Sequence, residues 1–377
     1  MSLIVHVRHL SETIGPRPSA SENERKAALY VKRTLEQMGI PAQMTEFKAL
    51  PTYSFLYMTI YTLFLAAALL VTAAPAAALA LSALGILFYL TENSTLETLA
   101  RLFPKRASHN AAGALVPDGE ISRTVIVSAH LDSSRSALFF HPALVKGFRS
   151  TFLTTIAAIA WTFALGAAGT AAGTRIPFWL ALPAAAYMAF TAALLIHREI
   201  AGRHTHGAVD NASGVAAMLG AAELLKNAPP HGKRVVFVAT GSEESGLFGM
   251  VNFLRKNRFD PETTRFLNID HVGTASLSYT TREGMIVRRK CDPEMIAIAG
   301  NFPLPSTGRP PLARDFSTML TDLCAPLVRG FNGMSIMAFN DDGTLPNWHW
   351  KTDVAQNISE ANLTDAAALA AHIIKNI

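Results

Sequence analysis

Acidic and imidazole side chains recur in this 377-residue chain beside a few short apolar runs. One such segment reads AHLD over residues 129–132, and another reads GSEESG over residues 241–246. Two adjacent carboxylates repel each other unless a cation or a proton lies between them. Imidazole nitrogens mixed with carboxylate oxygens are a donor set that suits divalent zinc. The candidate donors and their helpers are His130, Asp132, Asp210, Glu243, Glu244, Asp270 and His349.

Each of these residues also has an ordinary structural explanation when it is taken alone. A His-x-Asp pair such as His130 and Asp132 is usually a surface pair, and Asp210 can cap the helix that follows it. The two glutamates can form a solvated turn, Asp270 can close a strand end, and His349 can pack between two tryptophans. The joint pattern is harder to explain in this way, because nearly all the donors follow predicted strands. We therefore expect a mixed nitrogen and oxygen site for zinc.

The elements that must position these side chains alternate between strand and helix. Such alternation predicts an α/β three-layer sandwich with a mostly parallel central sheet. Ligands of such sheets bind beyond the carboxyl ends of the strands, where the candidate donors fall. The predicted strands are residues 42–47, 123–130, 233–240, 265–270 and 333–339, and the predicted helices are 21–38, 213–226 with Ser213 near its N-cap, and 360–374.

Two long segments of the chain are almost free of charge. Only 16% of all residues are charged, against about 25% in soluble domains. Residues 54–91 contain no acidic, basic or histidine side chain, and residues 150–196 contain only Arg175. A membrane span needs about 20 apolar residues. Each segment therefore predicts a hairpin of two transmembrane helices, turning near Pro75 and near residues 169–175, although a pair of buried core helices is the alternative.

The predicted organisation is thus one globular domain interrupted by two transmembrane hairpins. Its pieces are residues 1–53, 92–149 and 198–377, and the hairpins are residues 54–91 and 150–197. The second hairpin lies between Asp132 and Asp210, so the hairpins either form part of the substrate entrance or only anchor the domain. Because the second hairpin lies between these two site residues, we also expect the site end of the sheet to lie near the bilayer.

Positive side chains beside the membrane ends predict the orientation. The turns at the opposite ends offer only Arg175, so the positive-inside rule places the globular domain in the cytoplasm. The N-terminus lacks the apolar core of a secretory signal. A net charge of +5 located at the membrane ends favours anionic lipid over nucleic acid as a partner. The positive residues are Lys48, Arg101, Lys105, Arg106, Lys146, Arg149, Arg198 and Arg203.

The cysteine content is low. Cys291 and Cys324 do not make a disulfide framework, and we expect two buried thiols.

Six segments resemble one enzyme family, in the order in which that family has them. That family is metallopeptidase family 28, of the leucyl aminopeptidase and aminopeptidase Y type. The resemblance covers essentially all of the chain outside the two hairpins. The segments are IGPRPSASENERKAALYVKRTLEQMG, VIVSAHLDSS, HGAVDNASGVAAMLGAAELL, VVFVATGSEESGLFGM, FLNIDHVG and NWHWKTDVAQNI.

The resemblance implies two co-catalytic zinc ions. Asp210 would bridge both ions. His130 and Asp270 would complete one metal site, and Glu244 and His349 would complete the other.

The resemblance also implies roles for three further carboxylates. Glu243 would be the general base, Asp132 would orient the His130 side of the site, and Asp322 would line the substrate pocket. The expected fold is the zinc exopeptidase sandwich, and the expected activity is hydrolysis of N-terminal peptide bonds by a membrane-anchored aminopeptidase. Its partners would be peptide substrates and the lipid bilayer, without nucleic acid.

Three alternatives remain open at this point. The chain could be a catalytically inactive membrane scaffold or receptor of the same fold, or a glutaminyl-cyclase-like acyltransferase that uses a single zinc. A transporter is disfavoured, because the predicted spans lack the ionisable residues that transport pathways usually carry. No feature of the sequence specifies an oligomeric state or the preferred N-terminal residue.

Overall fold

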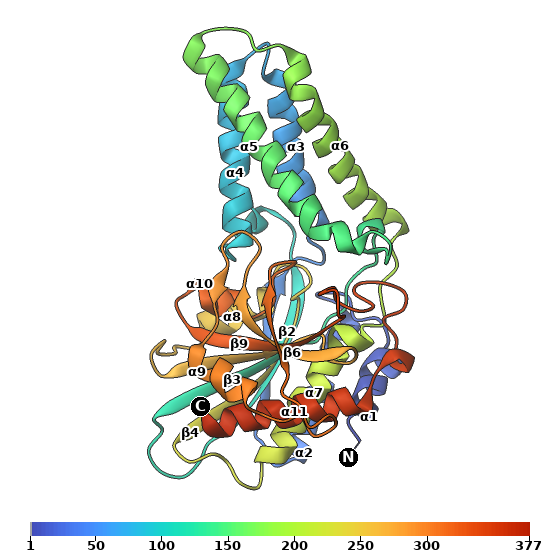
Figure 1. Cartoon of the computed structure of the whole chain (residues 1–377), viewed down its shortest axis with the longest axis vertical. Helices are drawn as coiled ribbons and strands as arrows, with labels where there is room; N and C mark the ends of the chain where they lie inside the picture. Colours follow the sequence, from blue (N-terminus) through green and yellow to red (C-terminus); the bar gives the residue numbers. More distant parts are fainter. Residues whose placement is uncertain (1) are drawn as a thin grey trace. The chain divides into compact units, whose positions relative to one another are not determined.

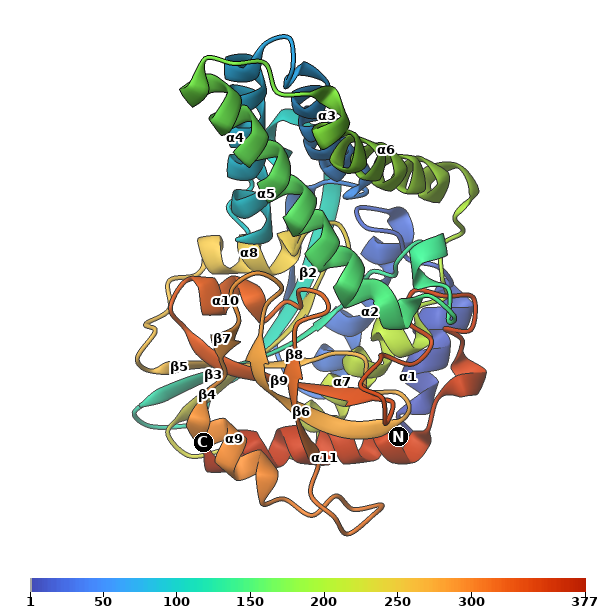
Figure 2. The ribbon, with the colours of Figure 1, turned by 45° about the horizontal axis from the view of Figure 1, so that its top comes forward.

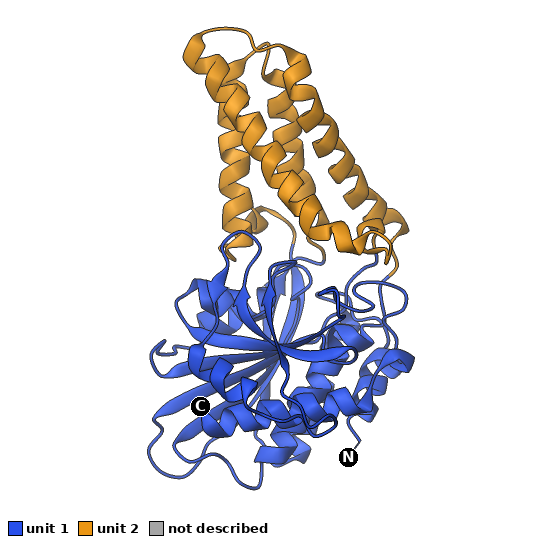
Figure 3. Ribbon diagram, in the orientation of Figure 1, with its two compact units in different colours: residues 1–51, 105–136, 204–377 blue, residues 52–104, 137–203 orange. Residues whose placement is uncertain are grey.

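The fold combines one mixed β-sheet domain with a bundle of long helices. The computed structural model describes residues 2–377, and these form two compact units (Figure 3). Unit 1 comprises Met1–Pro51, Lys105–Ser136 and His204–Ile377, and unit 2 comprises Thr52–Pro104 and Ala137–Arg203. Residues 92–104 and 137–149 thus group with the long helices.

Unit 1 contains a sheet of nine strands within residues 2–377. Eight of them follow the order β1-β2-β4-β3-β5-β9-β6-β7, and β8 pairs with β6. The strands are β1 (Ala42–Ala49), β2 (Arg106–Leu115), β3 (Arg123–His130), β4 (Lys233–Thr240), β5 (Thr264–Ile269), β6 (Ser276–Glu283), β7 (Arg289–Lys290), β8 (Leu312–Phe316) and β9 (Asn332–Phe339).

The sheet is parallel at its centre and mainly antiparallel at its flanks. β4, β3, β5 and β9 are parallel neighbours, whereas β1, β2, β6 and β7 pair antiparallel. The expectation of a mostly parallel sheet therefore holds only for the centre. The central strands were predictable because a strand covered on both faces is a continuous apolar run, as in β3 and β4. The flanking strands are more polar and give a weaker signal.

Helices cover both faces of this sheet (Figures 1 and 2). One layer contains α2, α7 and α11 with α1 beside them, and α8 and α10 pack against strands of the other face. The helices of unit 1 are α1 (Ile4–Arg8), α2 (Glu22–Gln37), α7 (Ser213–Leu225), α8 (Phe248–Lys256), α9 (Pro293–Gly300), α10 (Cys324–Val328) and α11 (Glu360–Asn376). The predicted α/β sandwich is confirmed at this level.

Helix boundaries follow local chemistry. Ser21 caps α2 by accepting the amide proton of Glu24 at 3.2 Å, and the positive φ of Gly39 follows the helix end. α7 begins at Ser213, but its N-cap position is Ala212. The Ser213 hydroxyl instead donates to the carbonyl of Val209 at 2.6 Å. Ser213 thus lies next to the N-cap, as predicted, and a short π-helical segment, η5 (Ala208–Ala212), precedes the helix.

Unit 2 consists of two helical hairpins with short connecting segments. The first hairpin is α3 (Ser54–Leu70) and α4 (Pro75–Asn93), with Pro75 at the first turn of α4. The second is α5 (Phe148–Ala172) and α6 (Phe178–Ala201). In the described part of the chain, three helices are long and apolar enough to cross a membrane, and α3, with 17 residues, is a shorter apolar helix.

Unit 1 is interrupted at one end of its sheet. Ala49 of β1 pairs with Arg106 of β2, so the first interruption, after Pro51, lies at that end. β2 runs antiparallel to β4, and β4 runs parallel to β3. This end is therefore also where β3 and β4 finish. The second interruption follows Ser136, six residues beyond the last residue of β3.

The two cysteines are free and buried, which confirms the expectation of separate thiols.

Candidate metal centre

The predicted donors converge at the carboxyl end of the parallel strands. His130 is the last residue of β3, and Asp270 directly follows β5. Glu243 and Glu244 lie in the turn after β4, whereas Asp210 lies in η5 and His349 in the loop after β9. Five separate segments thus bring their donors to one place in unit 1.

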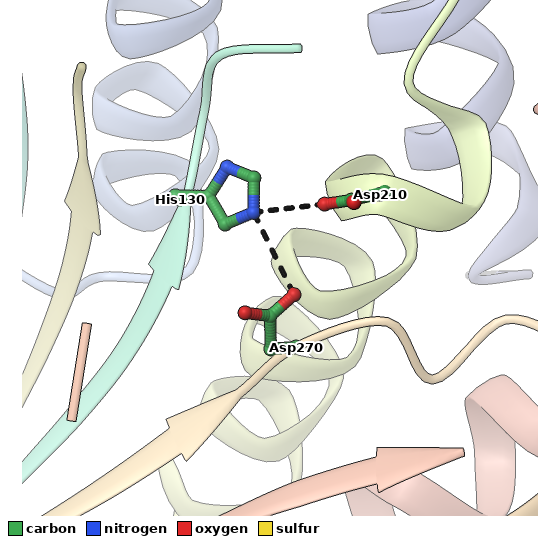
Figure 4. Close-up of side chains that lie close together, drawn as sticks. All are labelled: His130, Asp210 and Asp270. Atoms are coloured by element: carbon green, nitrogen blue, oxygen red, sulfur yellow. Dashed lines mark hydrogen bonds and ion pairs between the residues drawn. The ribbon is translucent and has the colours of Figure 1, made fainter. Parts of the chain in front are cut away.

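Asp210 lies at the centre of this cluster. Its Oδ1 is 3.0 Å from His130 Nε2, which is 3.6 Å from Asp270 Oδ1 (Figure 4). Its Oδ2 is 3.1 Å from His349 Nε2, which is 3.0 Å from Glu244 Oε1. The two oxygens of one carboxylate therefore face two different groups, each made of one imidazole and one further carboxylate.

The atoms of each group are close enough to share an ion. One ligand atom from each of His130, Asp210 and Asp270 lies within 4.8 Å of the others, and the same holds for Asp210, Glu244 and His349. A third such group joins His130, Glu243 and Glu244. Glu243 therefore borders both halves of the cluster.

The charge state of the cluster supports a cationic occupant. Burial and the neighbouring carboxylates raise the pKa of Glu243 well above its usual value, and burial also raises the pKa of Glu244. Burial opposes ionisation of Asp210, but hydrogen bonds from three histidines hold its pKa well below the usual range. So many buried carboxylates need protons or cations for compensation. The buried donors, with one nitrogen and two oxygens on each side of Asp210, fit zinc.

Burial alone would lower the pKa of a histidine, because it disfavours the charged imidazolium. Burial disfavours the imidazolium of His349, but the charge of Glu244 and hydrogen bonds to Asp210 and Glu244 raise its pKa to about 9. For His130, burial is likewise outweighed, by Glu243 and by hydrogen bonds to three aspartates, so its pKa is raised well above the usual value. A metal ion would take the place of these protons, because zinc binds the neutral imidazole.

Asn211 fixes the segment that carries Asp210. Its Nδ2 donates to the carbonyl of Ile269 at 2.9 Å, and its Oδ1 accepts the amide protons of Gly214 at 2.9 Å and His271 at 3.1 Å. A Cβ at Gly214 would lie 2.2 Å from Asn211 Oδ1 and 2.3 Å from the carbonyl oxygen of Ile269. Only glycine fits there, so the sequence Asp-Asn-x-x-Gly ties η5 to the end of β5.

Several residues beside the donors adopt left-handed backbone angles. The φ values are +53° at Ser242, +56° at His271 and +49° at His349. Each such non-glycine residue costs about 1–3 kcal/mol and persists only where the surrounding structure enforces it. The strain therefore gathers in the turns that aim Glu243, Asp270 and His349.

Asp132 reaches both His130 and the glutamate turn. Its Oδ1 is 3.5 Å from His130 Nδ1, which lies 3.1 Å from the backbone oxygen of Asp132. Its carboxylate also accepts the amide protons of Glu243 at 3.0 Å and Glu244 at 3.1 Å, and the hydroxyl of Ser19 at 2.6 Å. The structure thus adds a contact that the sequence did not suggest.

Asp322 is fully buried and accepts a short hydrogen bond from the Thr240 hydroxyl at the end of β4. Burial raises the pKa of Asp322 to about 7. Thr240 pairs with His130 across β4 and β3, so Asp322 lies close to the cluster.

Arg17 is a site residue that the sequence analysis missed. Its fully buried guanidinium donates to the carbonyls of Leu131 at 2.7 Å, His206 at 2.9 Å and Gly207 at 2.8 Å. It also donates to the carbonyls of Leu10 and Gly15. Leu131 follows His130, and Gly207 precedes Asp210 closely. The only signal in the sequence is an arginine between two prolines, Gly-Pro-Arg-Pro.

Hydrogen bonds around Arg17 join the two ends of the second interruption. The Thr205 amide donates to the Ser134 carbonyl at 2.9 Å, and the Ser133 hydroxyl donates to the Thr205 carbonyl at 3.0 Å. The Ser133 amide donates to the Arg17 carbonyl at 2.9 Å. We name these residues, Arg17, Ser133, Ser134 and Thr205, the arginine clasp. It connects the segments that carry His130 and Asp210.

Two further residues support Asp210. His271 Nδ1 lies 3.6 Å from Asp210 Oδ2, and its Nε2 lies 2.7 Å from the carbonyl oxygen of Pro346. Asp353 accepts the amide proton of Val209 at 2.6 Å, and burial raises the pKa of Asp353 to about 7. Both lie in the quoted segments FLNIDHVG and NWHWKTDVAQNI, so their segments, but not their contacts, were predictable.

Comparison with known proteins places this cluster in context. Residues 191–374 match the model of peptidase family M28. A zinc aminopeptidase from Bacillus subtilis is similar in structure, with a TM-score of 0.58 at 15% identity, covering 99% of this chain and 93% of that one. No curated protein matches the chain in sequence.

Two further solved structures have the same fold. One is a Zn-dependent exopeptidase from Parabacteroides distasonis, with a TM-score of 0.57 at 14% identity, covering 100% of this chain and 97% of that one. The other is a glutaminyl cyclase from Bacteroides thetaiotaomicron, with a TM-score of 0.59 at 14% identity and the same coverage of both chains. At such identities the similarity establishes the fold.

Proposed function

We propose that the chain, a metallo-exopeptidase whose residues 191–374 match peptidase family M28, is a membrane-anchored, zinc-dependent aminopeptidase. It removes single residues from the free N-termini of peptides. Two zinc ions are held by the buried cluster of unit 1, with the donors in the roles that the resemblance implies.

The carboxylate of Asp210 carries this proposal. Its Oδ1 faces His130 and its Oδ2 faces His349, and each imidazole has a second carboxylate beside it. A site for one ion does not need a carboxylate with both oxygens engaged in this way. Asp210 would bridge two ions, His130 and Asp270 would hold one of them, and Glu244 and His349 would hold the other.

The chemistry follows from these positions. A bound zinc pair supplies Lewis-acid polarisation of a carbonyl and lowers the pKa of water. Glu243, which borders both donor groups, takes the proton from the attacking water and delivers it to the leaving amine. Asp132 holds the backbone amides of Glu243 and Glu244 and so aims the base.

A glutaminyl-cyclase-like acyltransferase is the second candidate, because a glutaminyl cyclase is among the similar structures. Such an enzyme closes an N-terminal glutamine onto its own amine and releases ammonia. The two-sided arrangement around Asp210 favours hydrolysis, since the cyclase reading needs a single zinc.

One assay separates these candidates. Detergent-purified protein with zinc receives one peptide with a free N-terminus, the same peptide acetylated, and a third beginning with glutamine, and mass spectrometry identifies the products. The proposal expects stepwise loss of single residues from the free form only, two zinc ions per chain, and no turnover by Glu243→Gln. Ammonia loss from the glutamine peptide with one zinc would establish the cyclase instead, and metal-free, inactive protein would establish a scaffold.

The second part of the proposal is that both hairpins span the membrane. Their outer surface exposes large apolar side chains such as Phe55, Leu69, Trp161, Trp179 and Phe190. Their threonine hydroxyls donate to carbonyls one turn earlier, as Thr59 does to Phe55 and Thr191 to Tyr187, which removes polar groups from an apolar solvent. α3, although short, spans together with the three longer helices.

Close packing inside unit 2 supports the same environment. A Cβ at Gly166 of α5 would lie 2.9 Å from the backbone nitrogen of Leu79 in α4. Small residues that let helix backbones approach are typical of membrane helix pairs. We place the turn at residues 173–177 outside and unit 1 in the cytoplasm. A cysteine introduced at Gly173 should react with an impermeant maleimide in intact cells, whereas one introduced at Gly119 of unit 1 should react only after lysis.

Replacing both hairpins by short soluble linkers tests their role in access. If they form part of the substrate entrance, turnover of lipid-anchored peptides falls more than turnover of soluble ones. Equal turnover of both substrates would reduce the hairpins to an anchor.

A further inference from the structure

The turn that carries the glutamates is held by carboxylates from outside it. The Ser242 amide donates to Glu24 Oε1 at 2.6 Å, and the amides of Glu243 and Glu244 donate to Asp132 at 3.0 and 3.1 Å. Three successive N–H groups therefore end on two buried acidic side chains, one from α2 and one that follows β3. Asp132 was expected near the site, but Glu24 was not.

Glu24 makes a dense set of hydrogen bonds. Its Oε1 also accepts the Ser242 hydroxyl at 3.0 Å, and its Oε2 accepts the hydroxyl of Ser108 in β2 at 2.8 Å. The side chain has no exposed surface. Burying a carboxylate is costly unless its oxygens are hydrogen-bonded, and here both oxygens are bonded to groups of the sheet edge near the site.

The local sequence would predict a different contact for this glutamate. Ser21 and Glu24 form a Ser-x-x-Glu pattern, in which the glutamate normally turns back to the N-cap amide. The Ser21 half of that pattern is present, since its Oγ accepts the Glu24 amide proton. The carboxylate of Glu24 instead extends to Ser242 and Ser108. The Glu24 carboxylate also receives a backbone hydrogen bond from Ala20, beside the N-cap, but the helix start does not account for its bonds to Ser242 and Ser108.

The turn itself depends on this outside contact. Ser242 has a φ of +53°, a region that a serine rarely adopts. A Cβ at the preceding Gly241 would lie 3.0 Å from Glu24 Cδ and 2.6 Å from the carbonyl oxygen of His109. The backbone thus packs directly onto the Glu24 carboxylate, which fixes the residue immediately before Glu243.

We propose that Glu24 is a positioning residue that aims the general base Glu243 by accepting the amide and hydroxyl protons of Ser242. This inference rests on the proposed function, because it assigns Glu243 the role of base. A displacement of about 1 Å in a catalytic group costs on the order of 100-fold in rate. Removing the acceptor should therefore lower turnover while leaving substrate affinity and zinc binding in place.

The test compares three variants of the full chain in detergent. Glu24→Ala removes the acceptor, and Glu24→Gln keeps one carbonyl oxygen that can accept both protons of Ser242. Glu22→Ala is the matched control. Glu22 lies on the same helix but is exposed, and within residues 2–377 its ion pair is with Arg25, at 2.6 Å.

The first readout is independent of activity. Hydrogen exchange followed by mass spectrometry on metal-free protein should show the peptide covering residues 241–248 exchanging about 10-fold faster or more in Glu24→Ala. Glu24→Gln and Glu22→Ala should retain the wild-type exchange of that peptide. Unchanged exchange in Glu24→Ala would overturn the proposal whatever the enzyme does.

The second readout separates positioning from folding. In the zinc-loaded protein, Glu24→Ala should lower kcat on the order of 100-fold with KM and zinc content within twofold of wild type, and Glu24→Gln should recover kcat to within about fivefold. Equal losses in both variants, or a loss expressed in KM or zinc content, would contradict positioning. If the wild type itself does not hydrolyse peptides, the proposed function fails, and the exchange result still decides whether Glu24 holds the turn.

Discussion

The two units of this chain differ in the side chains that they bury and in those that they expose. Unit 1 hides charge, and its buried residues include Arg17, Glu24, Asp210, Glu283 and Asp353. Unit 2 exposes apolar surface, and it carries most of the large hydrophobic side chains that are exposed in residues 2–377. In unit 1 buried charges gather around a site, whereas in unit 2 outward aromatic and aliphatic residues surround small, closely packed ones.

If both hairpins span the membrane, as we propose, this difference adapts one chain to two solvents. In water, a buried charge persists only with partners, and unit 1 supplies backbone carbonyls, hydroxyls and imidazoles for that purpose. In lipid, apolar surface carries no penalty but an unpaired polar group does. The hydroxyls of unit 2 accordingly bond within the helices, as Thr62 does to Met58. Each prediction below perturbs unit 1 or makes a matched change in both units.

Zinc removal should have the largest effect and should act on unit 1 alone. Without the ions, the buried carboxylates around Asp210 lose their compensating charge. A ligand present at about 1,000 times its Kd stabilises the native state by about 4 kcal/mol. Chelation should lower the unfolding temperature of unit 1 and abolish peptide hydrolysis, while the helical circular dichroism of unit 2 persists to the same temperature. Simultaneous loss of both signals would mean that the two units do not unfold independently.

A charge placed on an exposed apolar residue should be tolerated in unit 1 and rejected in unit 2. Phe190 in α6 and Leu224 in α7 are 59% and 54% exposed. Phe190→Arg should reduce membrane insertion by about 2.5–3.5 kcal/mol, the cost of arginine near the centre of a span. Leu224→Arg should change stability by less than about 0.5 kcal/mol, as for other surface substitutions. Equal tolerance at both positions in an insertion assay would contradict the membrane proposal.

Acid should weaken unit 1 through His6. Burial lowers the pKa of His6 from 6.5 to about 4, and its Nδ1 lies 2.7 Å from the Tyr30 hydroxyl. The unfolded chain therefore binds this proton first, so the stabilisation is complete above pH 6.5 and is lost as the pH falls toward 4. The loss at pH 5 should be about 2 kcal/mol.

Denaturant unfolding at pH 7 and pH 5 measures this loss. His6→Phe should remove most of the difference between the two pH values, and His372→Phe, at a half-buried histidine of α11, should leave most of it. A wild-type slope retained by His6→Phe would assign the acid sensitivity to other groups.

The smallest contrast concerns single hydroxyl groups. Tyr187 in α6 lies 3.0 Å from the Thr155 hydroxyl and donates to the Thr151 carbonyl at 2.8 Å. Tyr187→Phe should cost about 0.6 kcal/mol, as polar contacts between membrane helices do. In unit 1, Thr321 donates to the buried carboxylate of Glu283 at 2.6 Å, and Thr321→Val should cost about 1.5–3 kcal/mol. The reverse order in unfolding experiments would remove the distinction between the two solvents.

The sequence predicted the central elements of unit 1 well. The bounds of β3 and β4 coincide with the predicted segments, and α2 and α11 differ from theirs by at most two residues. These elements are long, strongly periodic or continuously apolar, and their burial on both sides leaves a clear pattern. The convergence of His130, Glu244 and Asp270 was foreseen for a related reason, because strand ends of one parallel sheet meet at one edge.

The unpredicted parts depend on contacts between distant segments. β6 and β8 pair in parallel across a long connection, and neither has a continuous apolar run. From the sequence, Glu24 is part of a helix start and Arg17 is a charged residue in a proline-rich turn. Only the fold places Ser242 beside Glu24 and Leu131 beside Arg17. Local periodicity contains no information about such partners.

The arginine clasp also marks a place where the chain can tolerate insertions of different length. Ser134 and Thr205 are joined by a backbone hydrogen bond, so the residues between them begin and end at adjacent points of unit 1. Closing a longer loop costs only about 0.6 kcal/mol for each doubling of its length. Segments of very different size can therefore be inserted between Ser134 and Thr205 while the spacing of His130 and Asp210 stays the same. Under the proposed function, an unrelated helical hairpin grafted there would attach the same catalytic domain to the membrane in a different way.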